Sequence, residues 1–243
     1  MALIYSHKEA DCGGSLIHQC FVLTARHCTD NRNPDQLTVV LGEYKRSVAE
    51  GREQVHNVSR IYRHPTHDIA ILALQSSAAT NRHVQVVELS KDEPEYGSAV
   101  VGGWGQVESD RGPLTSQTAD VLQYVHVPVV PRAFCNLTTT VDICAGDASS
   151  GSYTNACHGD SGGPLVQKRA GRWRQIGVVS RGPASCPAAS RYAIYTNVAT
   201  AYNWIKQTIP SIERQWRGKG LFGLLSAFAS RSEGNDYSIS AIC

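Results

Sequence analysis

Short apolar runs, rather than long helical periods, dominate this sequence and restrict the folds open to it. The runs are rich in β-branched residues and end at polar residues or glycine, which is typical of β-strands. Many short strands at close spacing predict an all-β sandwich or barrel. The expected strands lie at residues 21–25, 37–42, 70–74, 98–105, 121–130, 164–167, 175–180 and 193–198.

One helix is predicted near the end of the chain. Its apolar face consists of residues at helical spacing, namely Val198, Tyr202, Ile205 and Ile209. Pro210 follows directly and would stop the helix, because proline lacks the backbone N–H that a helix interior requires. Residues 90–97 are polar and contain a proline, so they are the candidate linker between two halves.

Composition narrows the classes of function. The net charge of +2 over 243 residues indicates no strong field for nucleic acid, and no apolar stretch reaches the roughly 20 residues of a membrane span. The eight cysteines show no CxxC pair or zinc-like spacing, so disulfides in a secreted protein are expected. The sequons at Asn57 and Asn136 fit secretion. The run from Met1 to Tyr5 is too short for a signal peptide, which suggests a fragment or a late start.

A glycine-rich loop at residues 155–164 carries the clearest chemical signal. Its sequence is Asn-Ala-Cys-His-Gly-Asp-Ser-Gly-Gly-Pro. Glycines allow a tight loop to aim backbone N–H groups inward, where they would stabilise an oxyanion while the hydroxyl of Ser161 attacks a carbonyl. A plain turn between strands would explain Gly-Asp-Ser alone, but the ten-residue string resembles the nucleophile loop of the chymotrypsin-like (trypsin-family) serine proteases.

Two further motifs supply a base and an acid. The string Thr-Ala-Arg-His-Cys, ending at Cys28, resembles the base-bearing segment of that family, with Arg26 where alanine is usual. The pKa of histidine lies near working pH, which suits His27 to proton transfer. Asp68 leads into an apolar strand and would fix the His27 tautomer, although a strand-end cap is the alternative. The chain order His, Asp, Ser is that of the chymotrypsin fold.

The resemblance covers residues 1 to 209 and implies a fold and a set of roles. The expected fold is all-β, with two six-stranded antiparallel β-barrels (1–94 and 95–210) and a C-terminal helix, followed by an extension at 211–243 that is a candidate for disorder. The implied catalytic residues are His27, Asp68 and Ser161. The N–H groups of Gly159 and Ser161 would form the oxyanion hole, and Ser180 would support Asp68 and line the substrate site.

The resemblance also implies cysteine pairings. Cys12 would pair with Cys28, Cys135 with Cys144, and Cys157 with Cys186. Cys20 and Cys243 have no counterpart in the family, so they either pair with each other, pair with another chain or stay free.

Primary specificity is expected to depart from that of trypsin. The family position at the base of the pocket holds Asn155 instead of aspartate, so a preference for Arg or Lys should be lost. Gly182 would keep one pocket wall open and Ala193 would narrow the other. We expect cleavage after uncharged, small to medium or polar residues. Arg181 replaces a tryptophan of the family beside this pocket, and only Thr66 and His67 separate His64-Pro65 from Asp68, fewer residues than in most relatives.

An acidic loop resembles the family's calcium loop. Its carboxylates are Glu43, Glu50 and Glu53, and the carbonyls of Lys45 and Val48 would supply further oxygens. The alternative is a solvated acidic loop whose charge is offset by neighbouring basic residues. No cofactor is required by the expected chemistry.

Two functions remain open at this stage. The first is a secreted serine endopeptidase that acts on polypeptides and is subject to protein inhibitors. The second is an inactive homologue used for binding or regulation. The segment whose freed ammonium pairs with Asp160 in active relatives is missing before Met1, so the chain as written is expected to be poorly active. A metalloenzyme is disfavoured because the sequence has no HExxH motif.

Overall fold

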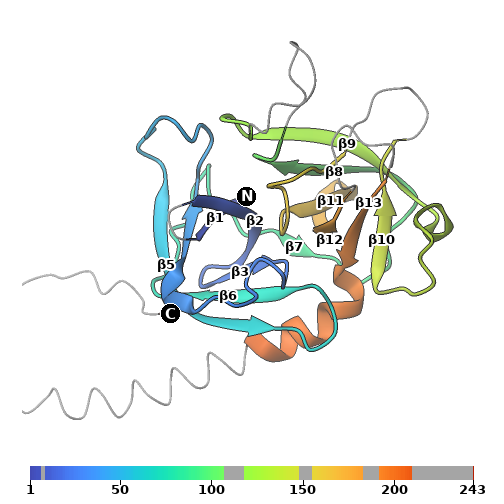
Figure 1. The fold of residues 1–243 in the computed structure, drawn as a ribbon, viewed down its shortest axis with the longest axis horizontal. Helices are drawn as coiled ribbons and strands as arrows, with labels where there is room; N and C mark the ends of the chain where they lie inside the picture. The colour runs from blue at the N-terminus through green and yellow to red at the C-terminus, as the bar shows by residue number, and fades with distance from the viewer. Residues whose placement is uncertain (7–8, 107–117, 148–154, 183–191, 210–242) are drawn as a thin grey trace, which may run out of the picture.

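A computed structural model describes residues 1–6, 9–106, 118–147, 155–182, 192–209 and 243. Two β-barrels lie side by side, with the first half of the chain in one and most of the second half in the other (Figure 1). The expected C-terminal extension lies outside the described residues, except for Cys243.

The first barrel is closed by six antiparallel strands. Around the barrel they run β1 (Ala2–Ser6), β2 (Glu9–His18), β3 (Phe21–Thr24), β6 (Ala70–Leu74), β5 (Gln54–Arg63) and β4 (Leu37–Leu41). All five residues of β6 are buried because it lies between β3 and β5 and its apolar side chains have no solvated face. A short 3-10 turn, η1 (Pro34–Gln36), leads into β4.

The second barrel has the same architecture. Its strands run β11 (Pro164–Arg169), β8 (Gly97–Gly103), β9 (Gln123–Val130), β10 (Asp142–Ala145), β13 (Ala193–Asn197) and β12 (Arg172–Arg181), and the pairing of β11 with β12 closes it. A 3-10 turn, η2 (Arg132–Cys135), precedes β10. The prediction of two six-stranded antiparallel barrels is therefore confirmed.

The connection between the barrels joins the second sheet early. Within it, β7 (Glu88–Leu89) pairs in parallel with β12 at Arg174 and Gln175. The boundary expected at residue 94 thus falls between β7 and β8.

The C-terminal helix, residues 198–209, follows the second barrel but packs on the first. Val198, Ala201 and Ile205 are fully buried in the core cluster of the first barrel, with Trp204 and Ile209 packed against it. The predicted face needs one correction, because Tyr202 lies outside this cluster and its ring faces the Lys206 ammonium at 5.9 Å. The buried face of the helix therefore consists of Val198, Ala201 and Ile205, at spacings i, i+3 and i+7, and does not include Tyr202.

Disulfides link Cys12 to Cys28 and Cys135 to Cys144, which are two of the three pairings that the resemblance implies. Cys20 is bonded to Cys243, so the last residue of the chain is attached to the turn between β2 and β3. Cys157 is also disulfide-bonded, and its expected partner Cys186 lies outside the described residues.

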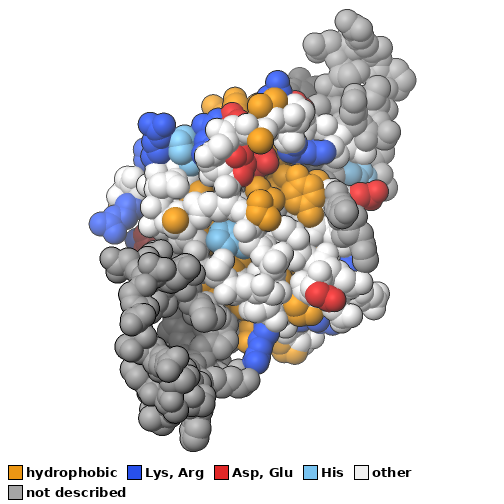
Figure 2. Space-filling view, turned by 90° about the vertical axis from the view of Figure 1, so that its left-hand side faces the viewer, with side chains coloured by type: hydrophobic (Ala, Val, Ile, Leu, Met, Phe, Trp, Pro, Cys, Tyr) orange, Lys and Arg blue, Asp and Glu red, His pale blue; other side chains and the backbone are white. Residues whose placement is uncertain are grey.

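No helix among the described residues has the length and apolar character needed to cross a bilayer. On the face shown in Figure 2, the described Lys and Arg side chains stand in separate groups, with acidic side chains between some of them.

Candidate active site

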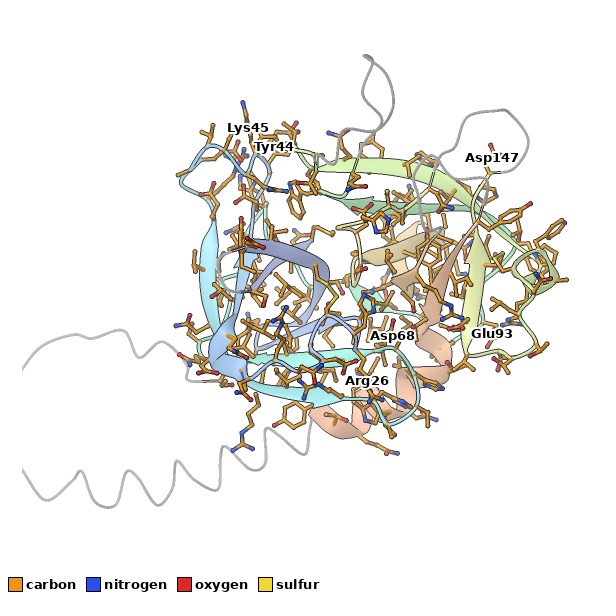
Figure 3. All side chains as sticks on the ribbon, in the orientation of Figure 1. Arg26, Tyr44, Lys45, Asp68, Glu93 and Asp147 are labelled. Carbon is orange, nitrogen blue, oxygen red and sulfur yellow. A yellow bond between two sulfur atoms is a disulfide. The ribbon has the colours of Figure 1, made fainter. Side chains whose placement is uncertain are left out.

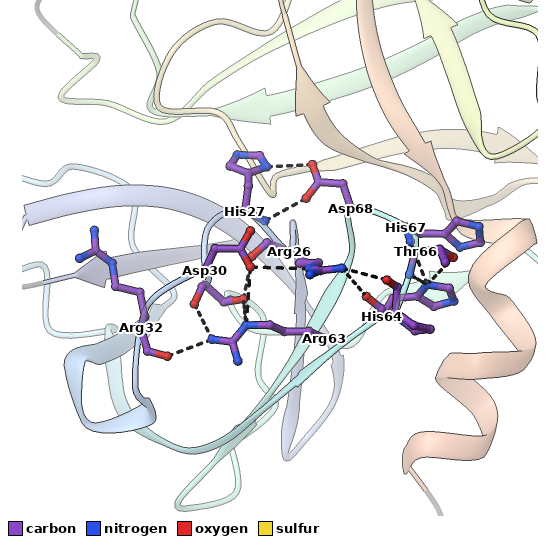
Figure 4. Close-up of polar contacts among 11 residues, drawn as sticks. Arg26, His27, Asp30, Arg32, Arg63, His64, Thr66, His67 and Asp68 are labelled. Carbon is purple, nitrogen blue, oxygen red and sulfur yellow. Dashed lines mark hydrogen bonds and ion pairs between the residues drawn. The ribbon is translucent and has the colours of Figure 1, made fainter.

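His27 and Asp68 meet through two hydrogen bonds (Figure 4). The backbone N–H of His27 donates to Asp68 Oδ1 at 2.9 Å, and His27 Nδ1 lies 2.8 Å from Asp68 Oδ2. His27 follows β3 and Asp68 comes just before β6, and these two strands are paired in the barrel. The strand pairing therefore brings together two residues that lie 41 positions apart in sequence.

Asp68 receives further support from the second barrel. Ser180 Oγ on β12 donates to Asp68 Oδ2 at 2.6 Å, and Thr196 Oγ1 on β13 donates to the Asp68 carbonyl at 2.9 Å. Burial alone would raise the pKa of Asp68, but the hydrogen bonds from His27 and Ser180 outweigh it and hold the pKa below its usual value.

The ionised state of Asp68 sets the tautomer of His27. A carboxylate can only accept hydrogen bonds, so Nδ1 of His27 must carry the proton that points at Asp68. In the neutral ring Nε2 then keeps its lone pair. This is the tautomer that a general base requires.

The Ser161 loop is built from backbone contacts. Gly163 N–H donates to the Asp160 carbonyl at 2.9 Å, and Gly162 N–H donates to the Val179 carbonyl at 2.8 Å. The Ser161 carbonyl accepts from Gly13 N–H on β2 at 2.7 Å, which ties this loop of the second barrel to the first barrel.

Gly162 brings the serine loop against the strand that leads to His27. Its φ is +80°, and a Cβ placed on it would lie 2.2 Å from Thr24 Oγ1 and 2.5 Å from the Gly13 carbonyl oxygen. The same Cβ would lie 3.1 Å from the Ala25 nitrogen, two residues before His27. Glycine is needed here both for the backbone conformation and for the close approach.

Asp160 is partly buried next to the loop. Its carboxylate accepts the Gly105 N–H at 2.8 Å and the Cys157 N–H at 2.9 Å. Burial raises the pKa of Asp160, and those two backbone bonds act against the rise. Gly159, which precedes Asp160, has a φ of +94° and lies against Gly105.

The expected pocket residues lie close to one another behind this loop. The Asn155 side-chain oxygen accepts the Ala156 N–H at 2.9 Å and the Tyr195 hydroxyl at 3.3 Å. Ala193 is fully buried, and a Cβ on Gly182 would lie 3.4 Å from the Ala156 carbonyl. Complete burial, together with the nearby Asp160 carboxylate, raises the pKa of Tyr195, so its hydroxyl stays protonated and remains a donor to Asn155.

Arg181 extends the site along β12. Its guanidinium pairs with the Asp142 carboxylate on β10 at 2.6 Å, and the arginine side chain remains 52% exposed. Asp142 also acts on His67 electrostatically, raising its pKa against the larger lowering effect of burial. A charged surface therefore lies next to Ser180.

The acidic loop gathers the three predicted carboxylates. Oxygens of Glu43, Glu50 and Glu53 all lie within 4.8 Å of one another. Burial raises the pKa of Glu43, and the other two glutamates raise it further. Glu50 forms an ion pair with Arg52, and Glu53 accepts the backbone N–H groups of Glu50 and Arg52.

The two carbonyls expected to join the carboxylates belong to residues of the same loop, between Glu43 and Glu50. The Lys45 carbonyl accepts the Val48 N–H at 3.0 Å, and Val48 is 47% exposed. A cluster of hard oxygens with mutual repulsion fits a calcium ion, although Arg52 already offsets part of the charge.

Sequence reasoning missed two contributors to the site. Thr196 carries no motif of its own, and only the pairing of β13 with β12 places it against Asp68. Arg26 stands out in the sequence only as a departure from the family pattern, yet its guanidinium bonds to the segment that carries Asp68 (Figures 3 and 4). No residue-spacing rule predicts either contact.

Two closed antiparallel barrels with an imidazole–carboxylate pair from one and a glycine-rich serine loop from the other define the chymotrypsin-like class. The family model described as Trypsin matches residues 1–205. The chain is 36% identical to rabbit (Oryctolagus cuniculus) coagulation factor IX, over 83% of this chain and 77% of that protein. It is 33% identical to pig (Sus scrofa) glandular kallikrein, over 85% of this chain and 89% of the relative. The chain therefore belongs to the trypsin family of serine proteases.

Proposed function

We propose that this protein is a serine endopeptidase in which Ser161, His27 and Asp68 form the catalytic triad. The observation that carries the proposal is the paired hydrogen bonding of Asp68 to His27, which leaves Nε2 as the basic nitrogen. Packing of Gly162 against Thr24 and Ala25 brings the serine loop to the same strand end. Family membership supports the same reaction class.

Each residue has a defined role in this proposal. Ser161 attacks the scissile carbonyl carbon while His27 Nε2 takes the hydroxyl proton, which forms a tetrahedral oxyanion. His27 then protonates the departing amine, leaving an acyl group on Ser161. Water hydrolyses that ester with His27 again acting as the base. Asp68 stays ionised throughout and stabilises the imidazolium.

The oxyanion would be held by the N–H groups of Gly159 and Ser161. The positive φ of Gly159 supports this assignment, because it turns the peptide at the place where inward N–H groups are needed. Asp160 supports the loop from behind through Gly105 and Cys157.

Labelling with a fluorophosphonate probe tests the proposal without knowledge of the substrate. Even at the poor activity expected of this chain, one probe adduct should form slowly at Ser161, and Ser161→Ala should acquire none. A folded wild-type protein that resists the probe would instead favour the alternative, an inactive homologue used for binding.

We further propose that the primary pocket takes uncharged, small to medium or polar side chains. Asn155 carries no charge, and its oxygen is already engaged by Tyr195 and Ala156. Arg181 adds a cation where an apolar wall is usual in the family, which disfavours apolar residues further along the substrate. Peptides that differ only at the residue before the cleaved bond should show slowest turnover for Arg and Lys; fastest turnover of either would overturn the assignment.

We also propose a structural calcium ion held by Glu43, Glu50 and Glu53 with the Lys45 and Val48 carbonyls. The convergence of the carboxylates supports it. We propose secretion, polypeptide substrates and regulation by protein inhibitors on the strength of the disulfides and the family. We propose no role in nucleic-acid binding, because the net charge is only +2.

A further inference from the structure

We propose that Arg26 is a positioning residue, which holds the turn carrying His27 and the connection carrying Asp68 at the separation that their contact requires. This inference rests on the proposed protease function. It concerns a residue outside the proposed catalytic triad, and it assigns a role to the arginine that precedes His27 in the sequence.

The guanidinium of Arg26 spans the two segments. One terminal nitrogen donates to the His64 carbonyl at 3.1 Å and to the Pro65 carbonyl at 3.0 Å, three to four residues before Asp68. Its Nε lies 3.6 Å from Asp30 Oδ1, within its own turn. Because Arg26 and His27 are adjacent in sequence, the clamp acts at the base of the histidine (Figure 4).

The connection between β5 and β6, to which Arg26 donates, is short and is stabilised by its own hydrogen bonds. His64 N–H donates to the Ile69 carbonyl at 3.0 Å, and the His64 Nδ1 accepts the His67 N–H at 2.9 Å and the Thr66 N–H at 3.2 Å. The His64 ring stacks on His67 and packs edge-on against Trp204. Because residues 64–69 are held together by these contacts, the hydrogen bond from Arg26 to the His64 carbonyl also restrains the position of Asp68.

A second arginine, Arg63, joins the same two segments in the opposite direction. Arg63, at the end of β5, donates through Nε to Thr29 Oγ1 at 3.0 Å and through a terminal nitrogen to the Arg32 carbonyl at 2.9 Å. Its Nε also lies 3.8 Å from Asp30 Oδ1. Asp30 thus stands between two guanidiniums, and each of them reaches across to the opposite segment (Figure 4).

Arg26 could act by positioning the two segments or only through the electric field of its positive charge at His27 and Asp68, and these two roles predict different results. A field effect depends on the positive charge alone, which lysine would preserve. The clamp depends on one terminal nitrogen reaching two carbonyls while Nε faces Asp30, and a lysine ammonium cannot reproduce that planar geometry. Small errors in the placement of catalytic groups reduce turnover rather than substrate binding, so kcat should fall while KM holds.

The test compares Arg26→Met and Arg26→Lys with wild type in the full chain. Peptide hydrolysis should show kcat lowered by roughly tenfold in Arg26→Met and by about threefold in Arg26→Lys, with KM within about twofold of wild type. The rate of fluorophosphonate labelling of Ser161 should fall in parallel. Arg172→Met, which removes an exposed arginine from the β11–β12 hairpin, is the matched control and should leave both rates unchanged.

The outcomes separate the two proposals. Wild-type rates in Arg26→Lys with slow Arg26→Met would indicate a field effect and overturn the positioning role. Wild-type rates in both variants would overturn it as well, while leaving the protease function intact. A wild-type chain that neither hydrolyses peptides nor labels at Ser161 would overturn the protease function and this inference with it. Melting temperatures of all variants show whether a lost rate reflects lost folding.

Discussion

The two halves of the proposed site are held in different ways. In the first barrel, His27 and Asp68 are fixed by side chains, since arginines, a buried histidine and the Cys12–Cys28 disulfide surround them. In the second barrel, backbone N–H groups and close glycine contacts hold most of the Ser161 loop, and the Asp160 carboxylate accepts two further N–H groups. The first half therefore depends on charge and protonation, whereas the second half depends on shape.

The largest expected effect comes from breaking the backbone half. Gly162→Ala would place a Cβ 2.5 Å from the Gly13 carbonyl oxygen at a φ of +80°. We expect the rate of Ser161 labelling to fall by roughly 100-fold, because the loop must move away from His27. Time-resolved labelling measures this loss.

Gly171→Ala is a matched control for that variant. Gly171 has a φ of +78°, but nothing lies within 4 Å of the position that a Cβ would take there. The substitution therefore carries the same backbone strain, about 1–2 kcal/mol, without the clash. Equal loss of labelling in both variants would show that backbone strain at any positive-φ glycine, rather than the close approach at Gly162, accounts for the loss.

A smaller effect is expected from the side-chain half when the pH changes. Burial lowers the pKa of His64 to about 4, with help from His67 and Arg26, whereas an unfolded histidine has a pKa near 6.5. Between these values the unfolded chain binds the proton and the folded chain does not. Acidification from pH 6.5 to 4 therefore destabilises the fold, and the stability that neutral His64 contributes is complete above pH 6.5.

His64→Asn would remove this dependence while keeping an acceptor for Thr66 and His67. Urea unfolding at several pH values measures the number of protons taken up on unfolding. Between pH 6.5 and 4, His64→Asn should take up about one proton fewer than wild type. His126→Asn, at an exposed position, serves as the control. An unchanged pH slope in His64→Asn would mean that His64 is not the group responsible.

The smallest expected effect concerns the acidic loop, which lies in the first barrel but away from His27. Calcium at about 10 mM should raise the melting temperature by roughly 3 to 6 °C, given the weak affinity of extracellular calcium sites. The effect should shrink on acidification, because the raised pKa of Glu43 makes its carboxylate the first to protonate.

Glu43→Gln should abolish the calcium response and leave Ser161 labelling unchanged. Differential scanning fluorimetry with added calcium and then with a chelator measures the response. A wild-type melting temperature that is insensitive to both would identify the loop as a solvated acidic segment, neutralised in part by Arg52.

Much of the fold and of the candidate site was predictable from sequence, for identifiable reasons. The strands are short, strongly apolar and bounded by turn residues, so propensity and burial agree at positions such as 70–74. The serine loop and the His27 and Asp68 segments carry strings long enough to identify a family. The predicted helix is present, but its predicted face is wrong at Tyr202, because spacing alone does not say which of two adjacent stripes meets the barrel.

The sequence by itself determined the class of fold and the chemical groups available, because both depend on local composition and on motifs read along the chain. The tertiary structure alone decided that Thr196 supports Asp68, that Arg26 reaches the His64 and Pro65 carbonyls, and that Cys20 is bonded to Cys243. These contacts join residues as many as 223 positions apart. Strand register and barrel closure bring Thr196 to Asp68 and the Arg26 turn to His64 and Pro65, and neither is encoded in any single stretch of residues.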